Sequence, residues 1–241
     1  MKLGELLRSE LPDYSVKLPS IDKALSFRPF LVKEEKTLLL VSEEGNEVDV
    51  LRAIKNILEN CFEDLDLSSI SLGEAEYLFV KLRERSVGET LELVYGKGLK
   101  KKPINLDLRK IKVPKRTGNK KSKFNITENI SVTLRELTLV DVIKNEINIW
   151  NSDQDDYIKM IASIIETVTL KEESLGSTDL SLAEKVDFIE NMTEQQFTEL
   201  AEFLKNGPRL SHTVKVEQEE GEDAEIEING LNDFFGLVSL I

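Results

Sequence analysis

Two residue types that carry out catalysis in many enzymes occur only once each in this chain, as His212 and Cys61. A Ser–His–Asp or Cys–His device would need His212, because imidazole is the general base in such devices. His212 stands at the first residue of a predicted strand, just after Pro208, which favours an edge or turn histidine. Cys61 falls on the apolar face of a predicted helix and is expected to be a small core residue, not a nucleophile. The sequence therefore predicts no catalytic residue, and we expect a protein that is not an enzyme.

Motifs that bind ions or nucleotides are also incomplete. Asp153, Asp155 and Asp156 lie as close together as the ligands of a calcium loop, but the glycine and the distal glutamate of that loop are absent at the required spacing. The helix dipole explains these acids better, because it favours negative charge at a helix N-terminus. Gly96 and Gly98 precede a strand instead of a helix, so they do not form a dinucleotide fingerprint. A single cysteine excludes an internal disulfide and a cysteine-based zinc site. No cofactor and no metal are predicted.

Charge is distributed unevenly along the chain. The net charge is −13, from 32 basic and 45 acidic side chains. Residues 97–123 hold twelve lysines and arginines against one acid, Asp107, so this stretch carries +11 and the rest carries −24. Charge alone would support nonspecific phosphate contacts, but no aromatic residue precedes Phe124 to stack on bases. An acidic protein surface, in the chain's own acidic half or in a second copy of the chain, explains the stretch at least as well. Nucleic acid is the less favoured partner.

The composition indicates a globular protein. Its 241 residues are 40% hydrophobic and 32% charged, which suits one large domain or two small ones. The longest apolar runs are four residues, such as 77–80, so no transmembrane helix fits and no membrane partner is expected. The start of the chain lacks the apolar core of a signal peptide. Together with the single cysteine, this predicts a cytoplasmic, or at least reducing, compartment.

Apolar periodicity predicts helices over most of the chain and strands in a few places. The segments expected to be helical are 33–41, 50–62, 71–82, 138–149, 154–168, 182–191 and 194–205. Two hairpins are predicted over 91–108 and 214–228, and residues 124–134 add one or two further strands. The predicted fold class is α+β, mostly helical, with two small antiparallel β-hairpin sheets.

The predicted elements divide the chain into three parts. Residues 1–26 form an N-terminal arm, 27–134 a helical module with a basic hairpin, and 135–241 a helical module with an acidic hairpin and an apolar C-terminus. Ser71 with Glu74 and Thr193 with Gln196 both fit a capping box, and the apolar positions that follow match at the same offset. One interpretation is a pseudo-duplicated helix–helix–hairpin module, and the other is a chance alignment of two amphipathic helices with hairpins.

Aromatic residues near the two ends of the chain could either fill the core or dock partners. Phe27 and Phe30 flank Arg28 and Pro29, and the pair 234–235 precedes an apolar C-terminal tail. If exposed, such residues would form a docking patch, since exposed apolar and aromatic groups dominate protein interfaces.

Four segments, taken in order, resemble one known family. They are Phe27-Arg-Pro-Phe-Leu-Val-Lys-Glu-Glu-Lys36, Ile54-Lys-Asn-Ile-Leu-Glu-Asn-Cys61, Glu76-Tyr-Leu-Phe-Val-Lys-Leu-Arg83 with Ser86-Val-Gly-Glu89, and Pro208-Arg-Leu-Ser-His212 with Gly230-Leu231 and Asp233-Phe-Phe235. As a set they resemble the baseplate hub assembly proteins of T-even-type contractile-tailed phages. Some relatives carry cysteine pairs on the first hairpin, whereas residues 96–102 contain none, so no metal is implied.

The resemblance implies a function in building the central hub of a phage tail baseplate. A member is expected to be a non-enzymatic assembly chaperone that binds other hub proteins in the host cytoplasm and masks their unassembled surfaces. A permanent structural subunit of the hub is one alternative, which would also place the protein in the virion tail. A regulator that binds nucleic acid or a host factor through 97–123 is the other.

The residues expected to contact partner proteins, or a second copy of the chain, come from the two ends and from the tip of the basic hairpin. They are Phe27, Arg28, Pro29, Phe30, Lys33, Lys100, Lys101, Lys102, Phe234 and Phe235.

Overall fold

The computed structural model describes residues 7–8, 10–44, 46–95, 102–118, 120–171, 173–217 and 223–235. Within those ranges no helix combines the length and the apolar character that crossing a bilayer requires. Internal contacts divide the chain into two units. Unit 1 comprises Met1–Asp66, Gly73–Pro114 and Arg209–Ile241, and unit 2 comprises Leu67–Leu72 and Lys115–Pro208. These contact units follow other bounds than the modules expected at 27–134 and 135–241.

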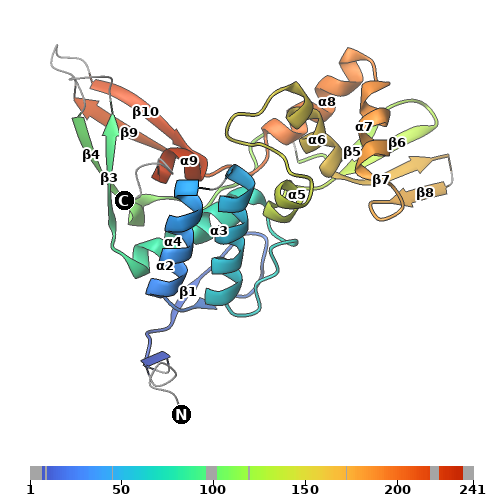
Figure 1. Cartoon of the computed structure of the whole chain (residues 1–241). Helices are drawn as coiled ribbons and strands as arrows, with labels where there is room; N and C mark the ends of the chain where they lie inside the picture. Colours follow the sequence, from blue (N-terminus) through green and yellow to red (C-terminus); the bar gives the residue numbers. More distant parts are fainter. Residues whose placement is uncertain are drawn as a thin grey trace. The chain divides into compact units, whose positions relative to one another are not determined.

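The helices of unit 1 include one with a clear apolar face, α3. In the described residues they are α2 (Val32–Glu44), α3 (Glu47–Cys61), α4 (Leu72–Ser86), the 3₁₀ helix η2 (Leu108–Lys110) and α9 (Gly230–Phe235). Helix α3 begins at Asn46, whose side chain accepts a hydrogen bond from the N–H of Asp49. The apolar face predicted for this helix is confirmed, since Val50, Ile54 and Ile57 are all buried. Helix α2 packs beside α3 in Figure 1.

Both predicted hairpins are present in unit 1. The first joins β3 (Thr90–Tyr95) to β4 (Lys102–Asp107), with Leu91 opposite Leu106. The second joins β9 (Ser211–Glu217) to β10 (Asp223–Asn229), with Ile228 opposite His212. A third, shorter pair joins β1 (Tyr14–Val16) to β2 (Leu25–Phe27).

Unit 2 is a four-stranded antiparallel sheet covered by helices. Its strands are β5 (Lys123–Asn125), β6 (Ile130–Leu134), β7 (Ile165–Leu170) and β8 (Glu173–Gly176), paired in that order. Its helices are α5 (Leu139–Lys144), α6 (Gln154–Ser163), α7 (Leu182–Glu190) and α8 (Glu194–Lys205). Phe124, Val132 and Val168, on three neighbouring strands, belong to one buried cluster with Leu200 and Phe203 of α8. This shared core lets short strands form a stable sheet.

The expectation of two hairpin sheets alone is wrong, because the described residues form four antiparallel sheets. Strands β1 and β2 have three residues each, too few to show an alternating pattern. The pairing of β6 with β7 places Ile130 opposite Leu170. Periodicity describes one segment at a time and contains no information on such a distant partner.

The helix predicted over 154–168 is shorter than expected. Helix α6 ends at Ser163, and the following residues form strand β7 from Ile165. The β-branched residues Thr167, Val168 and Thr169 favour the strand, because their side chains fit a pleated surface better than a helix.

Of the two interpretations of the repeat, the contact units favour a chance alignment over a duplication. Helix α4 is followed by the β3–β4 hairpin within unit 1, whereas α8 belongs to unit 2 and the β9–β10 hairpin after it belongs to unit 1. A helix and a hairpin that belong to different units are not one repeated module. The capping box at the start of α8 is nevertheless confirmed, with Thr193 and Gln196 each bonding the other's backbone N–H.

Candidate interaction surfaces

The segment after β2 is a buried polar clasp centred on Arg28. The backbone N–H of Arg28 donates to the carbonyl of Cys61 at 3.0 Å, and the Arg28 guanidinium donates to Pro29 O at 2.8 Å and to Asn60 O at 3.0 Å. The same guanidinium donates to Glu34 Oε1 at 3.1 Å, and the other oxygen of Glu34 accepts the Leu31 N–H at 2.7 Å. Arg28 thus links the end of β2, the end of α3 and the start of α2.

Burial by itself would raise the pKa of Glu34, whose side chain is 6% exposed. The Leu31 N–H and the Arg28 guanidinium outweigh that effect and hold the pKa below its ordinary value. The carboxylate is therefore charged and has its positive partner in place, which makes Arg28 and Glu34 a structural pair.

The aromatic residues of this segment are mostly internal. Phe27 is 3% exposed, stacks on Phe62 at 4.8 Å between ring centroids and lies 5.6 Å from the ring of Tyr14. Phe30 is half-buried, and its N–H donates to Ser86 Oγ at 3.0 Å. Phe27 therefore contributes to the core of unit 1 and is not available at the surface for the docking role expected of it.

Pro29 is likewise half-buried, whereas Lys33, on the first turn of α2, has a side chain that is 67% exposed. The outward side of α2 also carries Val32, 81% exposed, and Leu40, 54% exposed, with the exposed Lys36 between them. Positions i, i+4 and i+8 share one side of a helix. We call Val32, Lys36 and Leu40 the α2 face.

The C-terminal candidates divide in the same way. Phe234 is fully buried in unit 1 and therefore serves the core instead of a docking patch. Lys100 and Lys101 lie outside the described residues, as do the side chains of Lys102 and Phe235.

A buried carboxylate holds the C-terminal segment of unit 1. Oε1 of Glu76, on α4, accepts the Leu231 N–H at 3.2 Å, and the preceding N–H, of Gly230, donates to Leu210 O at 2.9 Å. Gly230 has φ +62°, and a Cβ there would lie 3.1 Å from the Glu76 oxygen. Only glycine fits this conformation and approach without strain.

Burial raises the pKa of Glu76 to about 7, although the N–H groups of Leu231 and Leu210 and the charge of Arg209 oppose the rise. Sequence analysis assigned no role to this residue. The available signals were Gly230, two residues after a predicted strand, and the presence of Glu76 and Gly230 in the segments that carry the family resemblance.

Two of the residues considered for chemistry have structural roles, Cys61 in the core and Asp153 as a helix cap. Cys61 is 3% exposed, and burial raises the pKa of its thiol to about 11, so it is a poor nucleophile. The pKa of His212 is lowered, first by burial and then by Lys110 and Lys112. Asp153 caps α6 by accepting the N–H of Asp156 at 2.9 Å.

The basic stretch contributes separate sets of cations to the two units. Lys110 and Lys112 are exposed in unit 1 and make no ion pair within the described ranges, whereas Arg109 pairs with Asp107 and Glu89. In unit 2 the exposed cations are Lys115, Lys120, Lys121 and Lys123. Arg116 differs from them, because its side chain is 11% exposed and bonded inside unit 2.

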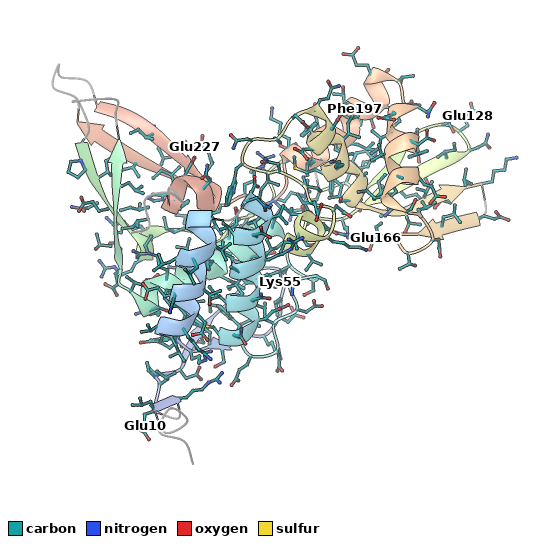
Figure 2. The ribbon with its side chains drawn as sticks, in the orientation of Figure 1. Glu10, Lys55, Glu128, Glu166, Phe197 and Glu227 are labelled. Atoms are coloured by element: carbon teal, nitrogen blue, oxygen red, sulfur yellow. The ribbon has the colours of Figure 1, made fainter. Side chains whose placement is uncertain are left out.

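A groove of about 210 Å³ opens beside these cations in unit 2, between β5 and α8. Its lining residues are Lys121, Phe124, Glu199, Glu202, Phe203 and Asn206. The rings of Phe124 and Phe203 meet edge to face at 5.9 Å. Phe197, labelled on α8 in Figure 2, instead packs against Tyr157 of α6 with ring centroids 6.4 Å apart.

Comparison with known proteins identifies one family. The family model described as T4 bacteriophage base plate protein matches residues 11–236, which is most of the chain. Searches of curated proteins and of solved structures found no match.

We expect the substitution Arg28→Ala to destabilise unit 1 by about 3 kcal/mol, because it leaves the buried Glu34 carboxylate with only the exposed Lys33, 3.6 Å away, as a positive partner. Urea denaturation measures this loss. Adding Glu34→Gln should recover part of it, since the uncompensated charge is then gone. Lys23→Ala is the control, because Lys23 pairs with Asp64 at the surface, where both side chains are more than half exposed. Equal free energies of unfolding for Arg28→Ala and Lys23→Ala would contradict the clasp.

We expect Glu76→Gln to remove a pH dependence of stability. The folded-state pKa of about 7 lies above the ordinary value of 4.5. The folded protein therefore holds this proton more tightly, and its stability falls as pH rises from 4.5 through 7. The total loss is about 3 kcal/mol. Glutamine keeps an oxygen for the Leu231 N–H without the charge. The free energy of unfolding of the wild type should therefore be lower at pH 8 than at pH 5, and this difference should be lost in the variant. Glu92→Gln, which removes an exposed carboxylate on β3, is the control and should behave as the wild type does. The same change in the free energy of unfolding between pH 5 and pH 8 in all three proteins would refute the assignment.

Proposed function

The chain belongs to the T4 bacteriophage base plate protein family, and we propose that it is a non-enzymatic hub assembly factor. In this role it binds other hub proteins in the host cytoplasm and masks their unassembled surfaces until the correct partner arrives. The family supports the coarser statement, a baseplate protein that interacts with other phage baseplate proteins in the tail or during its assembly. The finer statement rests on the surface of α2.

The α2 face is the observation that carries the proposal. Val32 and Leu40 are 81% and 54% exposed, although each could bury enough apolar surface to contribute about 2 kcal/mol on association. Lys33 and Lys36 stand next to them and are exposed as well. Two apolar side chains with Lys36 between them and Lys33 beside Val32 fit a partner surface that combines apolar and acidic groups.

Charge on the partner would act mainly on the rate and the selectivity of binding. Exposed lysines attract an acidic surface over a distance of about one Debye length, and they repel basic competitors. The affinity would come from the apolar residues, so a few such contacts give a complex that forms quickly and can be displaced. A factor that must release its partner needs this combination.

The double variant Val32→Asp/Leu40→Asp tests the α2 face. We expect it to lose capture of other baseplate proteins from infected cells by tenfold or more, because two apolar contacts become buried charges. Co-purifying proteins are quantified by mass spectrometry with the tagged full chain, and circular dichroism checks the fold. Val87→Asp is the matched control, since Val87 is also 54% exposed and lies in unit 1 outside α2. Undiminished capture by the double variant would remove α2 from the interface.

Finished particles separate a released factor from a permanent subunit. We expect purified virions to lack the protein, while assembly intermediates from the same cells contain it. Quantitative mass spectrometry of both fractions against known tail proteins measures the ratio. A fixed, whole-number copy number in intact virions would show a structural subunit of the baseplate instead.

A further inference from the structure

The groove of unit 2 has an aromatic floor and charged edges. Phe124 and Phe203 are 8% and 6% exposed and form its apolar base. Glu199 and Glu202 stand one turn apart on α8, both exposed, and make no ion pair within the part of the chain that is described. Lys121 belongs to the other edge, with its Nζ 5.2 Å from the centre of the Phe124 ring.

Unit 2 already holds one guanidinium, that of Arg116, against the ring of Phe203. The central carbon of the Arg116 guanidinium lies 3.7 Å from the centre of the Phe203 ring. Its nitrogens donate to both carboxylate oxygens of Glu136 at 2.7 Å and to Phe203 O at 2.9 Å. Stacking, a bidentate carboxylate and a carbonyl together satisfy the planar cation.

The groove also offers an aromatic floor and carboxylates, and Lys121 is the cation among its lining residues. Its floor is aromatic, Glu199 and Glu202 supply carboxylates, and Asn206 supplies a side-chain amide. The two carboxylates oppose entry of a phosphate or an acidic peptide. A lysine would be attracted too, but its compact ammonium cannot stack or bond in a bidentate manner as a guanidinium does.

We propose that this groove binds an arginine side chain presented by a protein partner. The proposal rests on the proposed function in taking that partner to be another baseplate protein. The guanidinium lies against the Phe124 and Phe203 floor and donates hydrogen bonds to Glu199 and Glu202. Lys121, at the opposite edge, repels a cation and so directs it toward α8. The groove thereby selects a basic segment, whereas the α2 face selects a surface that combines apolar and acidic groups.

A peptide titration tests the groove without any knowledge of the natural partner. The probe is acetyl-Gly-Ser-Arg-Ser-Gly-amide, added to the ¹⁵N-labelled full-length protein and followed by NMR. We expect the side-chain amide of Asn206 and the backbone amides of 199–206 to shift. The same peptide with citrulline, which has the shape of arginine without its charge, should bind at least tenfold more weakly.

The variant Glu199→Gln/Glu202→Gln should lower the affinity for the arginine peptide at least tenfold. Glu190→Gln is the matched control, because Glu190 is an exposed acid on α7 that does not line the groove. Equal affinity for the arginine and citrulline peptides would overturn the proposal, and so would a Glu190→Gln loss as large as that of the double variant. Capture of baseplate proteins is a separate readout. Peptide binding without capture would therefore refute the proposed function alone, and capture without peptide binding would refute the groove alone.

Discussion

The buried carboxylate of Glu76 is the constraint on which unit 1 depends. The chain leaves this unit after Pro114 and returns at Arg209, so its last part must be held by contacts formed far apart in the sequence. Glu76 accepts the Leu231 N–H, and the left-handed turn at Gly230 fits against the same oxygen. This turn leads into the short helix that places Phe234 in the core. A hydrophobic contact alone would allow the segment to slide, whereas a hydrogen bond to a buried acceptor fixes one register.

Buried and partly buried polar groups fix the backbone of unit 2 in the same way. Arg135 donates to both oxygens of Asp141 and to Ser163 O, so it joins the end of β6, the start of α5 and the end of α6. Its bonds to Asp141 raise the pKa of Arg135 despite its partial burial. Lys185, 6% exposed, donates to Ile165 O and Ser177 Oγ, and burial lowers the pKa of its amine. Such groups contribute little net stability, because desolvation offsets most of their attraction. Their contribution is to specify one arrangement.

Sequence reasoning succeeded where a single segment carries the whole signal. The buried face of α3, the register-forming alternation of β3 and β9, and the capping box at Thr193 all depend on neighbours within one element. It failed where the partner is distant. The pairing of β6 with β7 and the burial of Phe27 and Phe234 depend on segments that no local pattern identifies. Among the candidate surfaces, the cations of the basic stretch could be predicted by counting charges. The groove could not, because Phe124 and Phe203 come together only through the fold.

Helices α2 and α3 show how the fold leaves a surface for partners. Every apolar position of α3 that the periodicity predicts is buried, so α3 has no apolar side left to offer. Helix α2 differs, because Leu38 faces inward at 8% exposure while Val32 and Leu40 face solvent. Packing inside unit 1 requires only the first of these sides. An apolar residue on the second side adds nothing to folding and raises the risk of aggregation, unless another surface covers it. A helix that is apolar on two sides is suited to two partners, and α3 is one of them. In the function that we propose, the other is a second baseplate protein, in keeping with the family to which the chain belongs.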